Sequence, residues 1–363
     1  MRFPSDSFWR LIASALAPVL VSSVVAILSI PTYPAFAALI ATGTGTANTT
    51  APNPDPGFNR LGVVNGLSAV YFRNGWVLTA NHVGTATFWL AATGYAPVPG
   101  STVRFSNPDS SLADLIAFKL STRPALSNIA LADTPVSVST LVTLIGRGVD
   151  RGTATSWMGI GGWTWGGSST MRWGTNRISA VGDFVLDTRA FRTTFDDIRN
   201  PSPGEHEGDL VVGDSGGGAF TGTGTSAKLV GILFARSTYG GQPANTSLYG
   251  NHGLIADLYA YRNDILAVVD RPDCNDGLDE DGDGLVDYPS DPGCTNASDA
   301  SERGVGFACD NGVDDDGDSA IDFPSDTGCL HPSNAIEAPE PGIGLSLGFG
   351  VLTVATTWRR RGR

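Results

Sequence analysis

Cysteine is missing from most of this 363-residue chain, since the first of its four cysteines stands at position 274. The region before it must therefore fold without a disulfide. Between Ala38 and Val269 there is also no excess of either charge, because 15 acidic residues balance 15 basic residues. Nothing basic or aromatic is arranged along this region as nucleic-acid binding would require, so a nucleic-acid partner is excluded.

The negative charge is concentrated instead in the C-terminal part. The whole chain has a net charge of −13, yet the segment from Asp270 to Glu337 alone holds 19 acidic and only two basic residues. This contrast predicts a separate acidic module at residues 270–337. The acidity of the chain therefore says nothing about the substrate of the preceding region.

All four cysteines fall in the same acidic module. The spacing from Cys274 to Cys294 equals that from Cys309 to Cys329, 20 positions in each case. An even number of cysteines at matched spacing in an exported chain suggests the disulfides Cys274–Cys294 and Cys309–Cys329. Four cysteines allow three pairings, and the sequence alone leaves the other two open.

The N-terminal residues 1–37 have the features of a secretory signal peptide. Arg2 and Arg10 supply positive charge, residues 11–30 form an apolar run, and Ala35-Phe36-Ala37 is a small-x-small cleavage site. The alternative is an uncleaved membrane anchor. Residues 38–60, rich in Thr, Gly, Asn and Pro, are predicted to be a flexible leader.

Residues 61–269 alternate between short apolar runs and turn residues. Examples of these runs are Ser68–Phe72, Leu141–Ile145 and Leu229–Phe234. They have the length of strands, with no room for crossover helices between most of them, so we expect an antiparallel barrel or sandwich. Residues 254–269, with apolar positions at helical spacing, are predicted to form a closing helix.

The stretch from Gly146 to Arg177 is crowded with glycine and contains four tryptophans. One interpretation is an aromatic surface loop that contacts substrate. The interpretation we favour is a long connection whose tryptophans pack onto the barrel.

Three short motifs carry the chemistry of this region. Ser215 lies in the turn Gly213-Asp214-Ser215-Gly216-Gly217, His82 ends Thr79-Ala80-Asn81-His82, and Asp114 begins Asp114-Leu115-Ile116-Ala117. A serine hydroxyl is a poor nucleophile, so it needs a histidine to accept its proton and a carboxylate to orient that histidine. Each motif alone is weak, but the three together in this order point to nucleophilic catalysis.

The three motifs resemble those of the chymotrypsin-like (trypsin-like, S1-type) serine proteases, over residues 61–269. The resemblance implies an all-β fold of two six-stranded antiparallel barrels with a C-terminal helix. It makes His82 the general base, Asp114 its orienting carboxylate and Ser215 the nucleophile. The backbone N–H groups of Gly213 and Ser215 would form the oxyanion hole. Catalysis of this kind needs no cofactor.

The resemblance leaves specificity and activation open. Asp209 stands where trypsin-like members carry the acidic base of the primary pocket, which would favour cleavage after Arg or Lys. Arg236, just past the strand expected to line that pocket, could pair with Asp209 and cancel the preference. Animal members insert a new N-terminal amine against the aspartate before the serine, yet no Ile-Val-Gly-Gly follows a basic cleavage site here. The partner of Asp214 is therefore undetermined.

The acidic module contains a repeat of 35 residues, with carboxylates at alternate positions of a tight loop. Calcium prefers six to eight hard oxygen ligands, and this spacing converges several on one ion. The loops resemble acidic calcium repeats of secreted proteins, including the first half of an EF-hand loop, but lack its glutamate at the twelfth position. The alternative is a solvated acidic spacer held by the disulfides. The candidate calcium ligands are Asp279, Asp281, Asp283, Asp287, Asp314, Asp316, Asp318 and Asp322.

Residues 338–363 form a third kind of segment. Pro339-Glu340-Pro341 precedes an apolar run over residues 342–358 and then Arg359-Arg360-Arg361. The run predicts a hydrophobic helix at the short limit for spanning a membrane. The three parts in this order resemble the PEP-CTERM sorting signal of Gram-negative bacteria, which implies membrane attachment before processing by an exosortase-type system. A plain tail anchor is the alternative.

Together these features predict an exported serine endopeptidase that hydrolyses polypeptides through an acyl-enzyme intermediate. Signal peptidase and the exosortase-type machinery would process its ends and place it in the cell envelope, at the cell surface or outside the cell. The competing hypothesis is a non-catalytic surface protein that keeps the barrel for binding or for structure.

Overall fold

The computed structural model describes residues 39–197 and 206–339. The predicted signal peptide and the predicted terminal hydrophobic helix lie outside these residues. Among the helices of the described part, none combines the length and the apolar character needed to cross a membrane.

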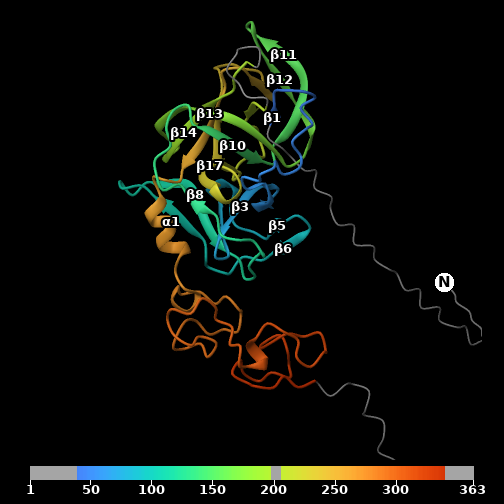
Figure 1. Cartoon of the computed structure of the whole chain (residues 1–363), viewed down its shortest axis with the longest axis vertical. Helices are drawn as coiled ribbons and strands as arrows, with labels where there is room; N and C mark the ends of the chain where they lie inside the picture. Colours follow the sequence, from blue (N-terminus) through green and yellow to red (C-terminus); the bar gives the residue numbers. More distant parts are fainter. Residues whose placement is uncertain (1–38, 198–205, 340–363) are drawn as a thin grey trace, which may run out of the picture. The chain divides into compact units, whose positions relative to one another are not determined.

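The protein is mostly β, and six of its strands form a closed antiparallel barrel (Figure 1). The strands follow the order β16-β10-β13-β14-β19-β17, and a further pairing of β16 with β17 closes the ring. The short β9 (Ala130–Leu131) adds to β17 in parallel. The ring consists of β10 (Leu141–Gly146), β13 (Arg172–Val185), β14 (Thr188–Thr194), β16 (Gly218–Thr221), β17 (Lys228–Ser237) and β19 (His252–Asp257).

The N-terminal half forms a second, seven-stranded sheet in the order β6-β5-β2-β3-β4-β8-β7. Its strands are β2 (Leu61–Val64), β3 (Leu67–Arg73), β4 (Trp76–Thr79), β5 (Phe88–Leu90), β6 (Thr93–Tyr95), β7 (Val103–Ser106) and β8 (Leu112–Lys119). Past β6 the chain turns back to the end of β8, where Val98 N donates to Lys119 O at 2.9 Å. No strand-to-strand ladder closes this sheet among the described residues, so the second six-stranded barrel is not shown.

The glycine- and tryptophan-rich stretch is largely strand. It forms most of β11 (Val149–Trp157), β12 (Ile160–Ser169) and the start of β13. Met158 and Gly159 join the first two strands with φ values of 52° and 82°, the pair of positive φ angles that a two-residue hairpin turn requires. The expected loop or long connection is therefore a β-hairpin, with β18 (Thr246–Leu248) paired to β12. Trp163, Trp165 and Trp173 do pack against buried apolar clusters, as the favoured interpretation expected.

The closing helix is shorter than the sequence predicted. Residues 254–257 belong to strand β19, and only α1 (Arg262–Val269) is helical. The run from Gly253 to Ala256 is buried on both faces between β14 and β17, and a strand buried on both faces shows a continuous apolar run. Of the positions with helical spacing, Leu258, Tyr261, Ile265 and Val268, only the last two lie within α1.

The remaining regular elements are short. One is the two-residue strand β1 (Leu39–Ile40), which pairs with β15 (Gly208–Asp209). The predicted flexible leader makes several hydrogen bonds after β1, for example from Arg172 Nη1 to Ala47 O at 2.6 Å. The 3₁₀ helices are η1 (Phe58–Arg60), η2 (Asn81–Val83), η3 (Gly224–Ser226), η4 (Asp273–Asn275) and η5 (Ala308–Asp310).

One apolar core joins the sheet and the barrel. Val70 and Phe118 from the sheet belong to the same buried cluster as Ile232 and Phe234 from the barrel and Ile265 from α1. Burying such a side chain contributes about 1.5–3 kcal/mol each relative to leaving it in water. This core holds the region together in place of disulfides.

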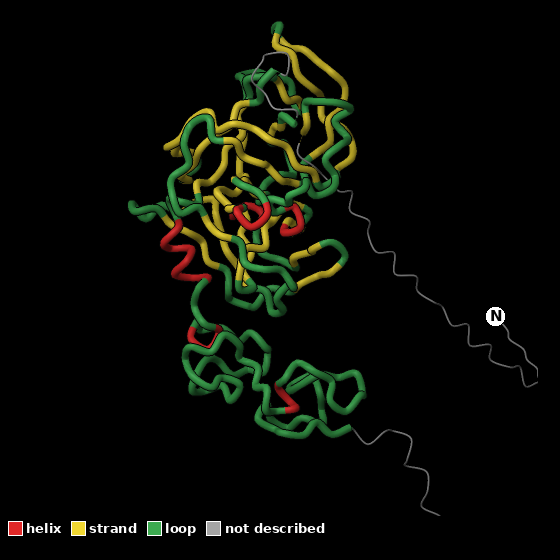
Figure 2. Tube along the Cα trace, viewed as in Figure 1, coloured by secondary structure: helices red, strands yellow, loops and turns green. Residues whose placement is uncertain are grey.

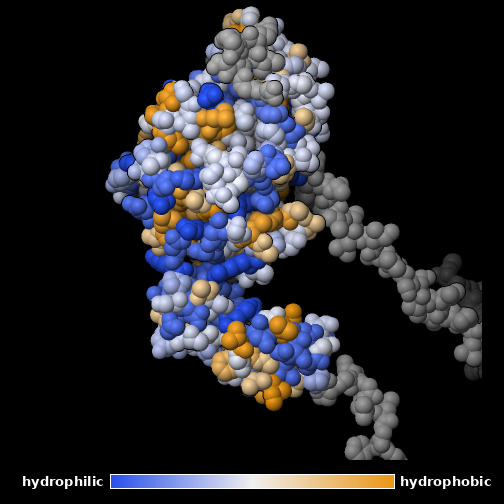
Figure 3. Space-filling view, viewed as in Figure 1, coloured by the Kyte–Doolittle hydropathy of each residue, from blue (hydrophilic) through white to orange (hydrophobic). Residues whose placement is uncertain are grey.

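The tail, residues 270–339, contains neither strand nor α-helix among its described residues, and Figure 2 shows it as loop with two short helical turns. Its disulfides are Cys274–Cys294 and Cys309–Cys329, the pairing that the spacing suggested. Several apolar side chains stay exposed between its polar loops (Figure 3). They include Val305, Val313, Ile321, Leu330 and Ile336.

A buried lysine connects the tail to β8. Lys119 is 1% exposed, and its Nζ donates to Asp273 Oδ1 at 2.9 Å, Asp276 Oδ2 at 2.5 Å and Glu280 Oε1 at 2.8 Å. Burial alone would lower the pKa of Lys119, but the three carboxyl groups outweigh it and raise that pKa above its ordinary value. The ammonium group is therefore held charged inside the contact.

Candidate active site

Strand pairing brings His82 and Asp114 together. His82 lies in η2, directly after β4, and Asp114 lies in β8, the neighbour of β4 in the sheet. His82 Nδ1 is 2.7 Å from Asp114 Oδ2, and His82 N donates to Asp114 Oδ1 at 2.9 Å. Because the ring contacts the carboxylate through Nδ1, its other nitrogen, Nε2, points away from the carboxylate.

The carboxyl group of Asp114 is kept ionised. Burial would raise the pKa of Asp114, but the hydrogen bonds from the side chain and backbone of His82 outweigh it and lower that pKa. The backbone of Asp114 is fixed as well, since its N–H donates to Thr188 Oγ1 at 2.8 Å. An ionised carboxylate at Nδ1 leaves Nε2 free to accept a proton.

Ser215 lies in the turn before β16, and β3 holds this turn. Ser68 N donates to Ser215 O at 3.0 Å. Gly216 has φ of 83°, and a Cβ there would lie 1.9 Å from Ser68 O and 2.1 Å from Thr79 Oγ1, so only glycine fits. The turn therefore packs against the end of β4, three residues before His82. Among the described residues no hydrogen bond joins Ser215 to His82, a contact that often forms only with substrate bound.

Two backbone donors of this turn stay free. Within the described residues, the N–H groups of Gly213 and Ser215 have no acceptor, whereas those of Asp214, Gly216 and Gly217 are all bonded. The Gly213 carbonyl is fixed by Ser68 Oγ, which donates to it at 3.0 Å. Buried N–H groups are rarely left unpaired, so two free donors beside a serine are suited to bind a developing oxyanion.

Asp214, the residue before Ser215, is buried. It is 1% exposed, and its carboxyl group accepts hydrogen bonds from Gly148 N at 2.7 Å and Val211 N at 2.9 Å. Burial raises the pKa of Asp214 to about 7. A Cβ at Gly146 would lie 2.2 Å from Asp214 Oδ1, which explains a glycine there. No basic side chain among the described residues forms an ion pair with Asp214.

A cavity of about 200 Å³ opens beside Ser215. Asp209 is not among its lining residues, because it is buried behind Arg236, whose Nη2 donates to Asp209 Oδ2 at 3.0 Å. The same guanidinium donates to Thr246 O and Asn251 Oδ1 and lies over Trp165, which fixes it in place. The structure thus brings Asp209 and Arg236 together. The cavity is lined by Leu210, Val211, Val212, Asp214, Ser215, Phe234, Ala235 and Arg236.

No protein-family model and no curated protein matches this chain. Among solved structures, human heparin binding protein is 15% identical to this chain, with a TM-score of 0.42. The match covers 61% of this chain and 96% of that protein. Kallikrein-related peptidase 10 in complex with Zn2+ is 16% identical over 59% of this chain and 96% of its own, with a TM-score of 0.38. Rv3671c protease in its inactive form is 13% identical over 59% of this chain and 90% of its own, with a TM-score of 0.34. Likenesses this distant do not establish a family, so the function depends on the geometry of the site.

Two residues that organise the site, Ser68 and Thr188, could not be recognised from the sequence. Ser68 accepts a hydrogen bond from Arg147 N at 3.0 Å while it donates to Gly213 O, so it connects three segments. Thr188 supports Asp114 from the barrel side. Both look like ordinary hydroxyl residues at strand positions, and only the pairing of strands shows what they contact.

The predicted calcium ligands separate into two groups. Oxygens of Asp279, Asp281 and Asp283 lie within 4.8 Å of one another, as do oxygens of Asp314, Asp316 and Asp318. Asp287 and Asp322 do not join them. The carboxyl group of Asp287 accepts hydrogen bonds from Asp276 N and Gly277 N, and that of Asp322 accepts from Asn311 N and Gly312 N.

Proposed function

We propose that this protein is a serine endopeptidase in which Ser215 is the nucleophile, His82 the general base and Asp114 the orienting carboxylate. The observation that carries the proposal is the 2.7 Å contact between His82 Nδ1 and Asp114 Oδ2. Two further features support it: Ser215 borders a cavity, and the free N–H groups of Gly213 and Ser215 stand in the same turn.

The reaction follows from these roles. Ser215 Oγ attacks the carbonyl carbon of the peptide bond while its proton passes to His82 Nε2. The N–H groups of Gly213 and Ser215 stabilise the negative oxygen, and losing one such donor typically costs about 2.7–4 kcal/mol. The leaving amine takes the proton from His82 and an acyl group remains on Ser215. Water, deprotonated by the same histidine, then releases the acid and restores the serine.

The preferred substrate residue at the cleavage site is apolar. Most of the cavity wall is apolar, and both oxygens of its acidic lining residue, Asp214, already accept backbone hydrogen bonds. Asp209, behind the wall, is paired with Arg236. A lysine or arginine side chain entering the cavity would meet the guanidinium of Arg236 instead of a free carboxylate. Like charges in a poorly solvated site repel, so basic substrate residues are disfavoured.

Export supports this function and also completes the site. The two disulfides of the tail are typical of proteins that fold in an oxidising compartment. Signal peptidase removes residues 1–37, and the exosortase-type system processes residues 338–363, which leaves the enzyme in the cell envelope, at the cell surface or outside the cell. Mass spectrometry of the mature chain tests both ends, and an intact residue 1–37 segment would contradict this route.

Cleavage after Ala37 frees the α-amine of Ala38, one residue before the buried Leu39. Leu39 lies opposite Asp209 in the β1–β15 pair and packs in the same apolar cluster as Val211, whose N–H binds Asp214. We propose that the ammonium group so freed neutralises Asp214 and thereby fixes the turn that carries Gly213 and Ser215. Signal-peptide removal would then activate the enzyme without a second cleavage.

A fluorophosphonate probe tests the proposal, since it reacts covalently with an activated serine. We expect it to label the folded wild type and not Ser215→Ala, and His82→Ala to react more slowly by about 10⁶-fold. Ser237→Ala, which removes an exposed serine at the end of β17, should label as the wild type does. A folded wild type that takes up no probe would reject the enzyme and favour a non-catalytic binding protein.

A further inference from the structure

Arg147 is a buried arginine whose guanidinium group has no acceptor. Three arginines are buried within the described part of the chain, and the other two are paired. Arg172 Nη2 donates to Asp150 Oδ1 at 2.9 Å, and Arg60 Nη2 donates to Ser127 O. Arg147 is 9% exposed, its Nη1 is buried without an acceptor, and neither Nε nor Nη2 has one among the described residues. Because a buried charge without a partner destabilises a fold, Arg147 is not there for stability.

The protein itself supplies no negative charge to Arg147. Burial lowers the pKa of its guanidinium group, and no carboxylate of the described residues offsets this effect. Lys119, by contrast, is buried among three carboxyl groups that raise its pKa. Asp214 lies against the glycines on both sides of Arg147, yet its oxygens accept hydrogen bonds from Gly148 N and Val211 N. A partner for the guanidinium group therefore has to come from a ligand.

The backbone places Arg147 beside the turn that carries Ser215. Its N–H group donates to Ser68 Oγ at 3.0 Å, and Ser68 Oγ donates to Gly213 O, also at 3.0 Å. Two hydrogen bonds therefore separate Arg147 from the turn whose N–H groups face the reacting carbonyl in the proposed mechanism. An extended peptide advances about 3.3–3.6 Å per residue, so a group on one of the first two residues beside the cleaved bond is within reach of an arginine side chain.

Arg147 lies on the side of the leaving segment, the part of the substrate that follows the cleaved bond. The residue before that bond enters the cavity beside Ser215, and Arg147 is not among the residues that line this cavity. The leaving amine takes its proton from His82, which directly follows β4. Ser68, to which Arg147 is bonded, belongs to β3, and β3 pairs with β4. The leaving segment therefore runs towards the strands that hold Arg147.

We propose that Arg147 binds a carboxylate of the leaving segment, within the first two residues after the cleaved bond. This inference rests on the proposed function and names its substrate class more closely. A guanidinium group can bind a carboxylate through two parallel hydrogen bonds, and such charge-assisted bonds are about twice as strong as neutral ones. The carboxylate comes from an acidic side chain or from the C-terminus of a short leaving segment. The preferred substrate then has an apolar residue before the cleaved bond and a carboxylate after it.

Peptide cleavage by the exported full chain tests this preference. The peptides share leucine before the cleaved bond and carry either Glu or Gln at the first or the second residue after it. A further pair has two uncharged residues after the bond and ends there in a free carboxylate or in an amide. We expect kcat/KM to be at least about tenfold higher for a charged peptide than for its uncharged counterpart, since hydrogen bonds to charged groups are the stronger kind. The pair that shows the difference distinguishes a side chain from a chain terminus.

Substitution of Arg147 tests whether this residue causes the preference. In Arg147→Met the ratio of kcat/KM for charged and uncharged peptides should fall to about one, because the cation is gone. Arg147→Lys keeps a positive charge without the planar fork and should keep part of the preference. Arg177→Met is the matched control, since Arg177 is an exposed arginine of β13 that donates to Ser139 O. Its ratio should equal that of the parent.

Thermal unfolding separates this role from a structural one. Replacing an arginine that stabilises the fold lowers the unfolding midpoint. Removing an unpaired buried charge should instead leave the midpoint of Arg147→Met equal to that of the parent or higher. Arg147→Gln provides a second variant should Arg147→Met fail to fold.

Peptide binding to the Ser215→Ala chain makes the test independent of catalysis. We expect the charged peptide to bind at least about tenfold more tightly than its uncharged counterpart, and Arg147→Met to abolish the difference. A binding preference in a wild type that cleaves no peptide would reject the protease and keep the carboxylate site. Equal binding of charged and uncharged peptides, or a preference that persists in Arg147→Met, would overturn the inference and leave the role of Ser215 untouched.

Discussion

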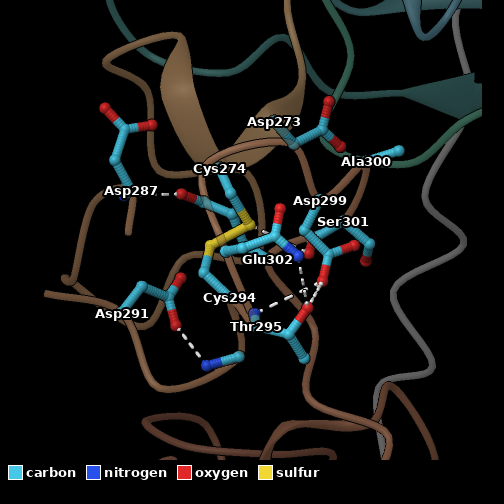
Figure 4. The surroundings of a disulfide bond; sticks show 12 residues. Asp273, Cys274, Asp287, Asp291, Cys294, Thr295, Asp299, Ala300, Ser301 and Glu302 are labelled. Carbon is cyan, nitrogen blue, oxygen red and sulfur yellow. Dashed lines mark hydrogen bonds between the residues drawn. A yellow bond between two sulfur atoms is a disulfide. The ribbon is translucent and has the colours of Figure 1, made fainter. Parts of the chain in front are cut away.

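The barrel region, residues 39–269, and the tail, residues 270–339, are held together by different interactions. The barrel region has strand ladders, buried apolar clusters and no cysteine. The tail has two disulfides, of which Figure 4 shows Cys274–Cys294, and its carboxyl groups accept the backbone hydrogen bonds that strands would otherwise provide. Glu302 is an example, because its Oε2 accepts from Glu280 N at 2.8 Å and its Oε1 from Asp287 N at 2.9 Å.

The second repeat shows that this use of carboxylates is systematic. Glu337, 35 residues after Glu302, accepts in the same way from Asp315 N and Asp322 N. The comparison shows that many acidic side chains of the tail have a structural role, because they accept the backbone hydrogen bonds that carbonyl groups accept in a strand ladder. Lys119 connects the two regions, because it belongs to β8 and binds three carboxyl groups of the tail.

Replacing Lys119 with methionine gives the largest expected loss of stability, because it removes the cation shared by Asp273, Asp276 and Glu280. Breaking a buried ion pair by removing one partner costs about 3–5 kcal/mol. We expect the tail to become sensitive to limited proteolysis under conditions in which the parent resists. Lys228→Met, at an exposed ion pair with Asp133, is the control and should change stability by less than about 1 kcal/mol. Equal resistance in both variants would show that Lys119 does not attach the tail.

Removing a disulfide should affect the tail alone. Cys309→Ser with Cys329→Ser opens a loop with 20 positions between its ends, and closing a loop of about that length contributes about 3 kcal/mol. The tail should then unfold at a lower denaturant concentration, while the barrel region, with no cysteine, keeps its own transition. Tryptophan fluorescence follows the barrel region, because six of the eight tryptophans lie between residues 76 and 173. The other two, Trp9 and Trp358, lie in the end segments that are predicted to be processed. A large shift of that transition would contradict the independence of the two regions.

An N-terminal extension tests how the barrel region is activated. With Met-Gly added before Ala38, no α-amine stands at the place proposed to neutralise Asp214. We expect kcat/KM to fall by about a hundredfold, as for the loss of one oxyanion donor. The thermal unfolding midpoint should not change, which serves as the control for folding. An extended enzyme as active as the mature one would mean that Asp214 needs no ammonium partner.

The smallest expected effect concerns specificity. Peptides with Leu or Phe at the cleaved position should react at least about tenfold faster than the same peptides with Arg, because Arg236 has already paired Asp209. The ratio of kcat/KM values measures this directly. A preference for Arg would show that substrate displaces Arg236 from Asp209.

The sequence predicted those parts of the molecule that depend on local order. His82 and Asp114, which the motifs singled out, lie together because β4, which ends just before His82, pairs with β8, which contains Asp114. It could not predict Ser68, because the hydrogen bonds of that hydroxyl join residues far apart in the chain. The strand β19 was missed because a run buried on both faces shows no alternation. The spacing also could not show that backbone amides of residues 276 and 277 donate to the carboxylate of Asp287, a predicted calcium ligand.

The burial of Lys119 also determines how the protein responds to chemical labelling. The chain has only two lysines, and their side chains differ sharply: Lys228 is 37% exposed and Lys119 is 1% exposed. An amine-reactive reagent therefore has, apart from the N-terminus, one open target and one target shielded where the tail meets β8. The chain thus contains its own reporter, since Lys119 can be modified only once the tail has separated from the barrel region.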